Sequence, residues 1–191
     1  MKRVLFFANL ILFILSAQIV RANTYTIDPK GNVVFTKTIE GLSLDQEQVY
    51  NAALKYLQEA YKDTNYKISI SNKEKGIVVG EGSFLAFHQS SNLVKTYTFN
   101  IDFWVRVDAK DGRARVQFIA KQYKVTSLSD IGDEKVENVN ISEVAPFADH
   151  DHSRRYYKAY DDLKPMVDKT LNAVSEAIKS TPALMLEDEN W

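Results

Sequence analysis

The stretch "VKTYTFNIDFWVRV", residues 94–107, decides the fold because hydrophobic and polar side chains alternate along it. In a β-strand, every second side chain lies on the same face. One face of this predicted strand is therefore buried, and its residues are Tyr97, Phe99, Ile101, Phe103, Val105 and Val107. The opposite face is mostly polar and carries Thr96, Thr98, Asn100, Asp102, Trp104 and Arg106.

Three further strand-like runs surround this one, at residues 66–71, 76–87 and 113–126. The segments between them, "NKEKG", "HQSSN" and "DAKDG", are rich in turn-forming residues, so the simplest connection is an antiparallel meander. In the last run, alternation places Ala114, Val116, Phe118 and Ala120 on the buried face. It places Arg113, Arg115, Gln117, Ile119, Lys121 and Tyr123 on the outer face.

One more strand and two helices complete the pattern. Residues 33–41 are rich in β-branched side chains and predict the first strand. A capping box at residues 43–46 predicts a helix to about Lys62, with an apolar stripe at helical spacing. A second helix ends near Lys179, and Pro165 leaves two possibilities for its start, near Ser153 or beyond Asp161.

This order of elements, β-α-β-β-β-β-α, predicts an α+β fold of two layers. Both helices need an apolar partner, and the mostly antiparallel sheet offers one apolar face. We therefore expect the two helices on one face of the sheet and an open second face.

The ends of the chain differ from this central domain. Residues 1–22 have a basic start, an apolar run and small residues before position 23, which predicts a secretory signal peptide cleaved after Ala22. The alternative, an uncleaved membrane anchor, is disfavoured because polar residues interrupt a run that is short for a bilayer. Residues 23–32 form a polar lead-in, residues 33–180 a single domain, and residues 181–191 an acidic tail. Within the domain, the polar residues 127–152 show no sustained period and predict a long surface loop.

Charge and cysteine content exclude several classes of function. Without residues 1–22, the chain has 21 basic and 25 acidic side chains, a formal charge of −4. This is the wrong sign for a nucleic-acid binder. The chain has no cysteine, and hence no disulfide and no thiol nucleophile. We expect a periplasmic or secreted protein with no membrane span after cleavage and no cofactor.

Three stretches resemble a known family: "LSLDQEQVYNAALKYLQEAYK", "ISISNKEKGIVVGEGSF" and "VDAKDGRARVQF". They are similar to the bacterial domain of unknown function 4468, found mainly in Bacteroidetes, over roughly residues 33–126. The resemblance implies a TATA-binding-protein-like (TBP-like) fold and an exported, cell-envelope location. It implies no enzymatic activity and no catalytic residues.

The predicted open face is the leading candidate site. It combines aromatic and cationic side chains, which suit small anionic or aromatic ligands and protein interfaces. The candidate residues are Trp104, Arg106, Arg113, Arg115, Lys121 and Tyr123, and Ile119, Asn100 and Asp102 lie among them. The alternative is a solvated face with incidental aromatics. A third use is self-association of two sheets edge to edge as a homodimer.

The segment "FADHDHSRRYY", residues 147–157, suggests a second kind of site. His150 and His152 would point the same way in an extended chain and could bind a metal, with His88 or a carboxylate as third ligand. A polar bend before a helix also accounts for this segment, since acidic residues there favour the positive end of the helix. The leading hypothesis is therefore a non-enzymatic binding module, and the alternative is a metal-dependent hydrolase or metal-binding protein.

Overall fold

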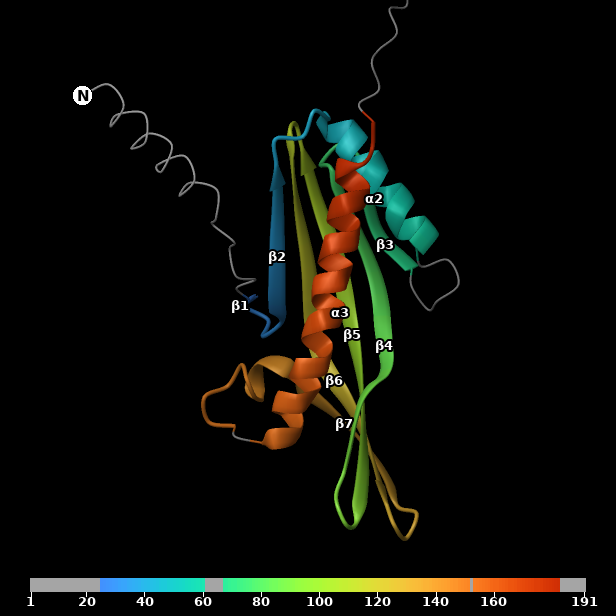
Figure 1. Cartoon of the computed structure of the whole chain (residues 1–191), viewed down its shortest axis with the longest axis vertical. Helices are drawn as coiled ribbons and strands as arrows, with labels where there is room; N and C mark the ends of the chain where they lie inside the picture. The colour runs from blue at the N-terminus through green and yellow to red at the C-terminus, as the bar shows by residue number, and fades with distance from the viewer. Residues whose placement is uncertain (1–24, 61–66, 152, 183–191) are drawn as a thin grey trace, which may run out of the picture.

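The computed structural model describes residues 25–60, 67–151 and 153–182, and its elements form two layers (Figure 1). One layer is a seven-stranded sheet. Its strands are β1 (Tyr25–Ile27), β2 (Val33–Glu40), β3 (Lys67–Asn72), β4 (Ile77–Ser91), β5 (Lys95–Lys110), β6 (Arg113–Ser129) and β7 (Glu134–Asn140). The other layer holds α2 (Gln46–Ala60) and α3 (Arg154–Lys179), and a 3-10 turn, η1 (Ile141–Glu143), follows β7.

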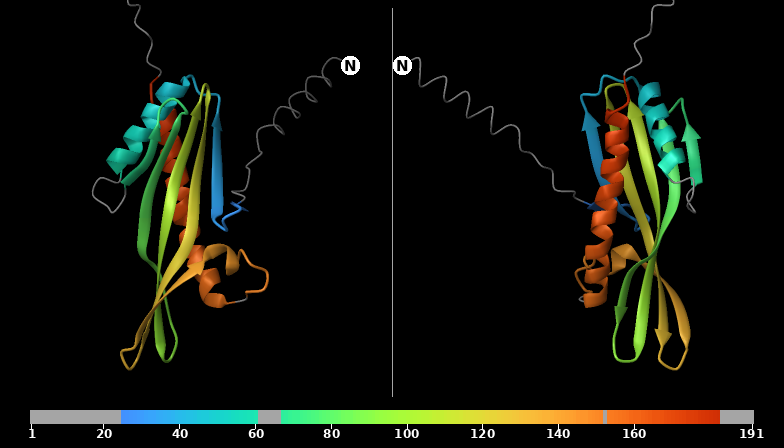
Figure 2. Two further views of the ribbon diagram at one scale, coloured as in Figure 1. Left: turned by 180° about the vertical axis from the view of Figure 1, so that it is seen from behind. Right: turned by 45° about the vertical axis from the view of Figure 1, so that its right-hand side comes forward.

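Every strand pair in the sheet is antiparallel. The strand order is β1-β2-β6-β5-β4-β3, and β7 pairs with the part of β6 that β2 leaves free. The helices contact each other and share β4 and β6 as neighbours, so they cover one face of the sheet (Figure 2). The predicted α+β class, with its mostly antiparallel sheet and open second face, is confirmed. None of the helices in the described residues is long and apolar enough to cross a bilayer.

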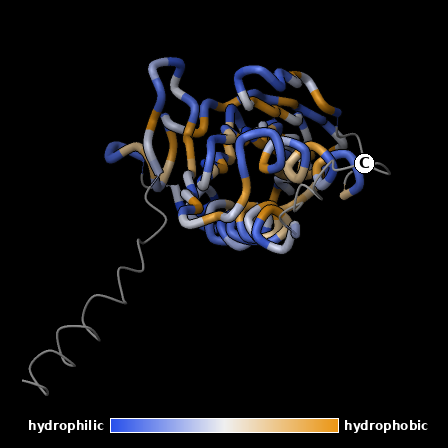
Figure 3. Tube along the Cα trace, turned by 90° about the horizontal axis from the view of Figure 1, so that it is seen from above, coloured by the Kyte–Doolittle hydropathy of each residue, from blue (hydrophilic) through white to orange (hydrophobic). Residues whose placement is uncertain are grey.

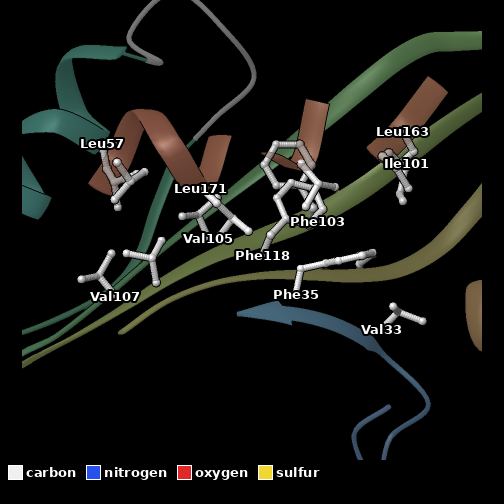
Figure 4. Close-up of a cluster of buried hydrophobic side chains, with 14 of the residues drawn as sticks. Val33, Phe35, Leu57, Ile101, Phe103, Val105, Val107, Phe118, Leu163 and Leu171 are labelled. Carbon is white, nitrogen blue, oxygen red and sulfur yellow. The ribbon is translucent and has the colours of Figure 1, made fainter. Parts of the chain in front are cut away.

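The core lies between the sheet and the helices, as the alternation in β5 predicts. Phe103 and Phe118 stack with ring centroids 4.6 Å apart, and both are nearly or fully buried. In the view of Figure 4 these rings lie between Leu171 and Leu163 of α3. Seen along the long axis of the molecule, hydrophobic and hydrophilic segments are interspersed along the chain trace (Figure 3). In β5, and in β6 before its bulge, the buried apolar residues fall on the helix side, so the other side is mostly polar.

Two β-bulges interrupt the sheet at the same level of β5. In β4, the register shifts between Phe84 and His88, where Ala86 has a φ of 47° and donates its N–H to Asn100 Oδ1 at 2.8 Å. In β6, Asp102 pairs with Gln122 and Phe103 with Ala120, which leaves Lys121 without a register partner. Beyond these bulges, β4 to β7 extend past the N-terminal end of α3 as two hairpins (Figure 1).

The bulge in β6 corrects one site prediction. A single extra residue reverses the alternation of all later side chains. Tyr123 was predicted on the open face, but it is fully buried on the helix side, where its ring lies 5.8 Å from that of Phe99. Its burial raises the pKa of the phenol. Tyr123 is therefore a core residue.

Four boundaries also differ from the sequence prediction. Strand β4 runs to Ser91 rather than ending at residue 87, so most of the predicted turn at residues 88–92 is strand. The lead-in contains β1, which pairs with the start of β2. The segment 127–152, expected to be a loop, instead contains the end of β6, strand β7 and η1. Strand β5 runs to Lys110 rather than ending at residue 107. The predicted signal peptide lies outside the described residues, as does most of the predicted tail.

The structure shows where both helices start. The capping box of α2 is formed by Asp45 and Gln48 rather than by Ser43 and Gln46. Asp45 Oδ1 accepts from the Gln48 N–H at 2.8 Å, and Gln48 Oε1 accepts from the Asp45 N–H at 3.0 Å. Of the two starts considered for the last helix, the one near Ser153 is observed, and α3 continues through Pro165.

Candidate functional site

The open face of the sheet brings together five of the six predicted residues. Their positions follow from the pairing of β5 with β6, in which Trp104 lies opposite Ile119, Arg106 opposite Gln117 and Asp108 opposite Arg115. The five residues on this face are Trp104, Arg106, Arg113, Arg115 and Lys121. They form two separate patches. Arg106, Arg113 and Arg115 lie around Asp108, and Lys121 lies on Trp104.

The first patch is organised by Asp108. Its Oδ1 accepts from Arg106 Nε at 2.8 Å, and its Oδ2 accepts from Arg115 Nε and Nη2 at 3.0 and 2.8 Å. The side chain of Asp108 is only 13% exposed. Burial alone would raise its pKa, but the hydrogen bonds and charges of Arg106 and Arg115 outweigh burial, so the pKa lies below its usual value. The carboxylate stays ionised and fixes both guanidinium groups.

Next to this triad, Lys110 and Arg113 lie directly opposite each other across β5 and β6. Like charges in such a position are destabilising unless an anion lies near them. Asp111, in the turn between them, instead accepts from the Gln46 N–H at the start of α2, at 2.8 Å. Glu40 lies opposite Arg113 on the other side of β6. The end of the open face therefore holds four cations against two carboxylates.

A shallow pocket of about 230 Å³ lies at this end of the sheet. We call it the arginine pocket, and its lining residues are Thr38, Asp108, Lys110, Arg113, Ala114 and Arg115. Thr38 adds a hydroxyl from β2, directly opposite Arg115. The sequence prediction missed Thr38, Asp108 and Lys110. Continuing the alternation of β5 by three residues would have found the last two.

The second patch surrounds Trp104. The Lys121 ammonium lies 4.3 Å from the centre of the indole ring, so it covers one face of the ring. Nearby, Ser83 donates to Asp102 and Lys67 pairs with Glu81. These polar groups satisfy one another. At about 3.3 Å per residue, the four residue steps from Trp104 to Asp108 span roughly 13 Å, which separates this patch from the arginine pocket.

The histidines do not form a shared site in the described residues. His88 is buried on the helix side of β4, and its Nδ1 lies 2.8 Å from Asp162 Oδ2 of α3. His150 is exposed before α3, and His152 lies outside the described residues. Asp151 has a structural role, since it accepts from the Ala145 and Ser153 N–H groups. Over residues 25–60, 67–151 and 153–182, no group of three or more His, Asp or Glu side chains could hold a metal ion.

The arrangement of helices and sheet is that of an α+β protein of TBP-like architecture. Residues 35–124 match a family model described as a domain of unknown function (DUF4468) with TBP-like fold. The resemblance inferred from the sequence is thereby confirmed for this segment. No curated protein matches the chain.

Two solved structures are similar to the chain over most of its length. One is a DUF4468 family protein from Bacteroides ovatus, 19% identical, with a TM-score of 0.54, covering 81% of this chain and 92% of that one. The other is a TBP-like protein from Parabacteroides distasonis, 15% identical, with a TM-score of 0.60, covering 80% of this chain and 96% of that one. At these identities the similarity shows the fold alone.

Proposed function

We propose that this protein is an exported, non-enzymatic binding module that takes a small anionic ligand in the arginine pocket. The observation that carries the proposal is the pair of like charges, Lys110 and Arg113, beside two arginines already fixed by Asp108. Glu40, opposite Arg113 on β2, offsets part of this positive charge, and a bound anion would offset the rest. The exported location rests on the predicted signal peptide.

The fixed arginines make the pocket suitable for an anion. Asp108 uses the Nε and one Nη2 hydrogen of Arg115, so the remaining guanidinium hydrogens point elsewhere and can donate to a ligand. A guanidinium held in place loses little side-chain entropy when it binds. Arg115 is 53% exposed and therefore accessible.

The size of the pocket limits the ligand. A volume of about 230 Å³ is below the range of pockets for drug-sized molecules, so it suits a phosphate, a pyrophosphate or a short dicarboxylate. An aromatic ligand would bind less well. Trp104 is roughly 13 Å from Asp108 in the arginine pocket, and Lys121 already covers one face of its ring. The arginine pocket therefore suits an anion better than an aromatic ligand.

The pocket is also poorly equipped for acid–base catalysis. Its one carboxylate, Asp108, has a lowered pKa and is bonded to two arginines, so it is a weak base near neutral pH. These features support a binding role.

The test is calorimetric titration of the mature chain, residues 23–191, with inorganic pyrophosphate at low salt. We expect saturable binding that weakens as salt is added. Arg113→Ala should weaken it at least ten-fold. Lys124→Ala removes one charge from the same strand outside the pocket and should leave binding unchanged. Absence of binding, or equal losses in both variants, would contradict the proposal.

A further inference from the structure

Strand β7 has an unpaired edge. It pairs with β6 on one side, and no other strand among the described residues pairs with it. Six of its seven residues are exposed, and its register with β6 is continuous over residues 134–140. Natural proteins protect such an edge with charged side chains, a proline, a bulge or a covering element. Strand β7 carries charges at Glu134, Lys135 and Glu137, and its register with β6 has no bulge. The sequence of β7, "EKVENVN", contains no proline.

The charges along this edge are self-complementary about Val136. Lys135 and Glu137 flank Val136 and form an exposed ion pair with each other within the strand. If two β7 strands run antiparallel with Val136 opposite Val136, each Lys135 lies opposite the Glu137 of the other copy. Moving the symmetry axis by one residue would place Lys135 against Lys135 or Glu137 against Glu137. Charge therefore selects one register.

Exposed aliphatic side chains support the same register. Val136 and Leu128 are each 49% exposed. Val136 lies opposite Thr126, so Leu128 is its diagonal neighbour on the same face of the β6–β7 hairpin. In the antiparallel pair, Val136 and Leu128 of both copies would form one continuous apolar strip of four side chains. Lys135 and Glu137 would lie on the other face.

We propose that β7 pairs antiparallel with β7 of a second copy of this chain, with Val136 on the two-fold axis. The pairing is isologous, since the same surface is used on both copies. A seven-residue strand pair is smaller than a standard interface of about 1,600 Å². The dimer should therefore be weak, with a dissociation constant of roughly 10–100 μM.

Cysteine cross-linking tests the register, because the chain has no cysteine of its own. Val136→Cys would place two thiols opposite each other, at a Cα separation of about 4.5–5.5 Å that a disulfide can bridge. Ile131→Cys is the matched control. Ile131 is more exposed, at 86%, but lies off the proposed axis. The Val136→Cys chain should cross-link at least ten-fold faster under mild oxidation; an equal or slower rate than that of Ile131→Cys would overturn the proposal.

Charge exchange provides an independent test by sedimentation velocity at up to about 300 μM. Lys135→Glu and Glu137→Lys should each weaken the dimer at least ten-fold, because each places like charges opposite each other. An equimolar mixture of the two variants should regain the dimer, since every facing pair is then of opposite sign. A wild-type chain that stays monomeric, or a mixture that does not recover, would overturn the proposal. A simple folding defect in either variant would not produce the recovery.

Discussion

Asp108 is the residue on which the open face depends. It is the least exposed charged group of the patch, and it holds Arg106 and Arg115 through both carboxylate oxygens. Breaking such a pair leaves two guanidinium groups with no fixed partner. The other ion pairs on this face, such as Lys67 with Glu81, are more exposed and contribute less.

Asp108→Asn should therefore lower the free energy of unfolding by roughly 1–3 kcal/mol at pH 7. Because the pKa of Asp108 is lowered in the folded state, its contribution is complete above the unfolded pKa of about 4. The contribution is lost as the pH falls further. Urea unfolding of both chains between pH 7 and pH 2 should show the difference shrinking below about pH 4. A difference that stays constant over this range would contradict the assigned role.

At the scale of the elements, the start of α2 shows which of two possible N-cap residues the helix uses. Ser43 and Asp45 are both good N-cap residues, and both are followed three positions later by glutamine. The structure uses Asp45, and it also gives the Gln46 N–H a partner in Asp111 of the β5–β6 turn. The helix start is thereby tied to the end of the sheet that holds the arginine pocket.

Asp45→Ala should cost about 1 kcal/mol of stability, whereas Ser43→Ala should change it by less than about 0.5 kcal/mol. Both side chains are exposed, so the comparison isolates the cap. Thermal unfolding of the two variants is sufficient to measure the difference. Equal effects, or a larger loss for Ser43→Ala, would contradict the observed capping box.

The sequence predicted those elements whose two faces differ in polarity. Strand β5 alternates between buried and exposed positions, so its faces could be assigned directly. Strand β7 is exposed on both faces, so it has no alternation to read and was expected to be a loop. The extra residue at Lys121 also has no signature in the alternation, which is why Tyr123 was placed on the wrong face.

At the scale of the whole molecule, the sheet has two different faces. The helix side supplies the core, including Phe35, Phe103 and Phe118, and the other side stays open and polar. The charges on the open side were predictable, but their division into two patches was not. That division depends on which cations Asp108 and Trp104 attract, and those contacts form only between neighbouring strands.

The most direct test of the central claim is an NMR titration of the isotope-labelled mature chain with inorganic pyrophosphate. We predict saturable shifts in the backbone amides of Thr38 and of residues 108–115, with little change around Trp104 and along β7. Shifts that are absent, or that centre on Trp104 or on another part of the chain, would contradict the assignment of the arginine pocket as the binding site.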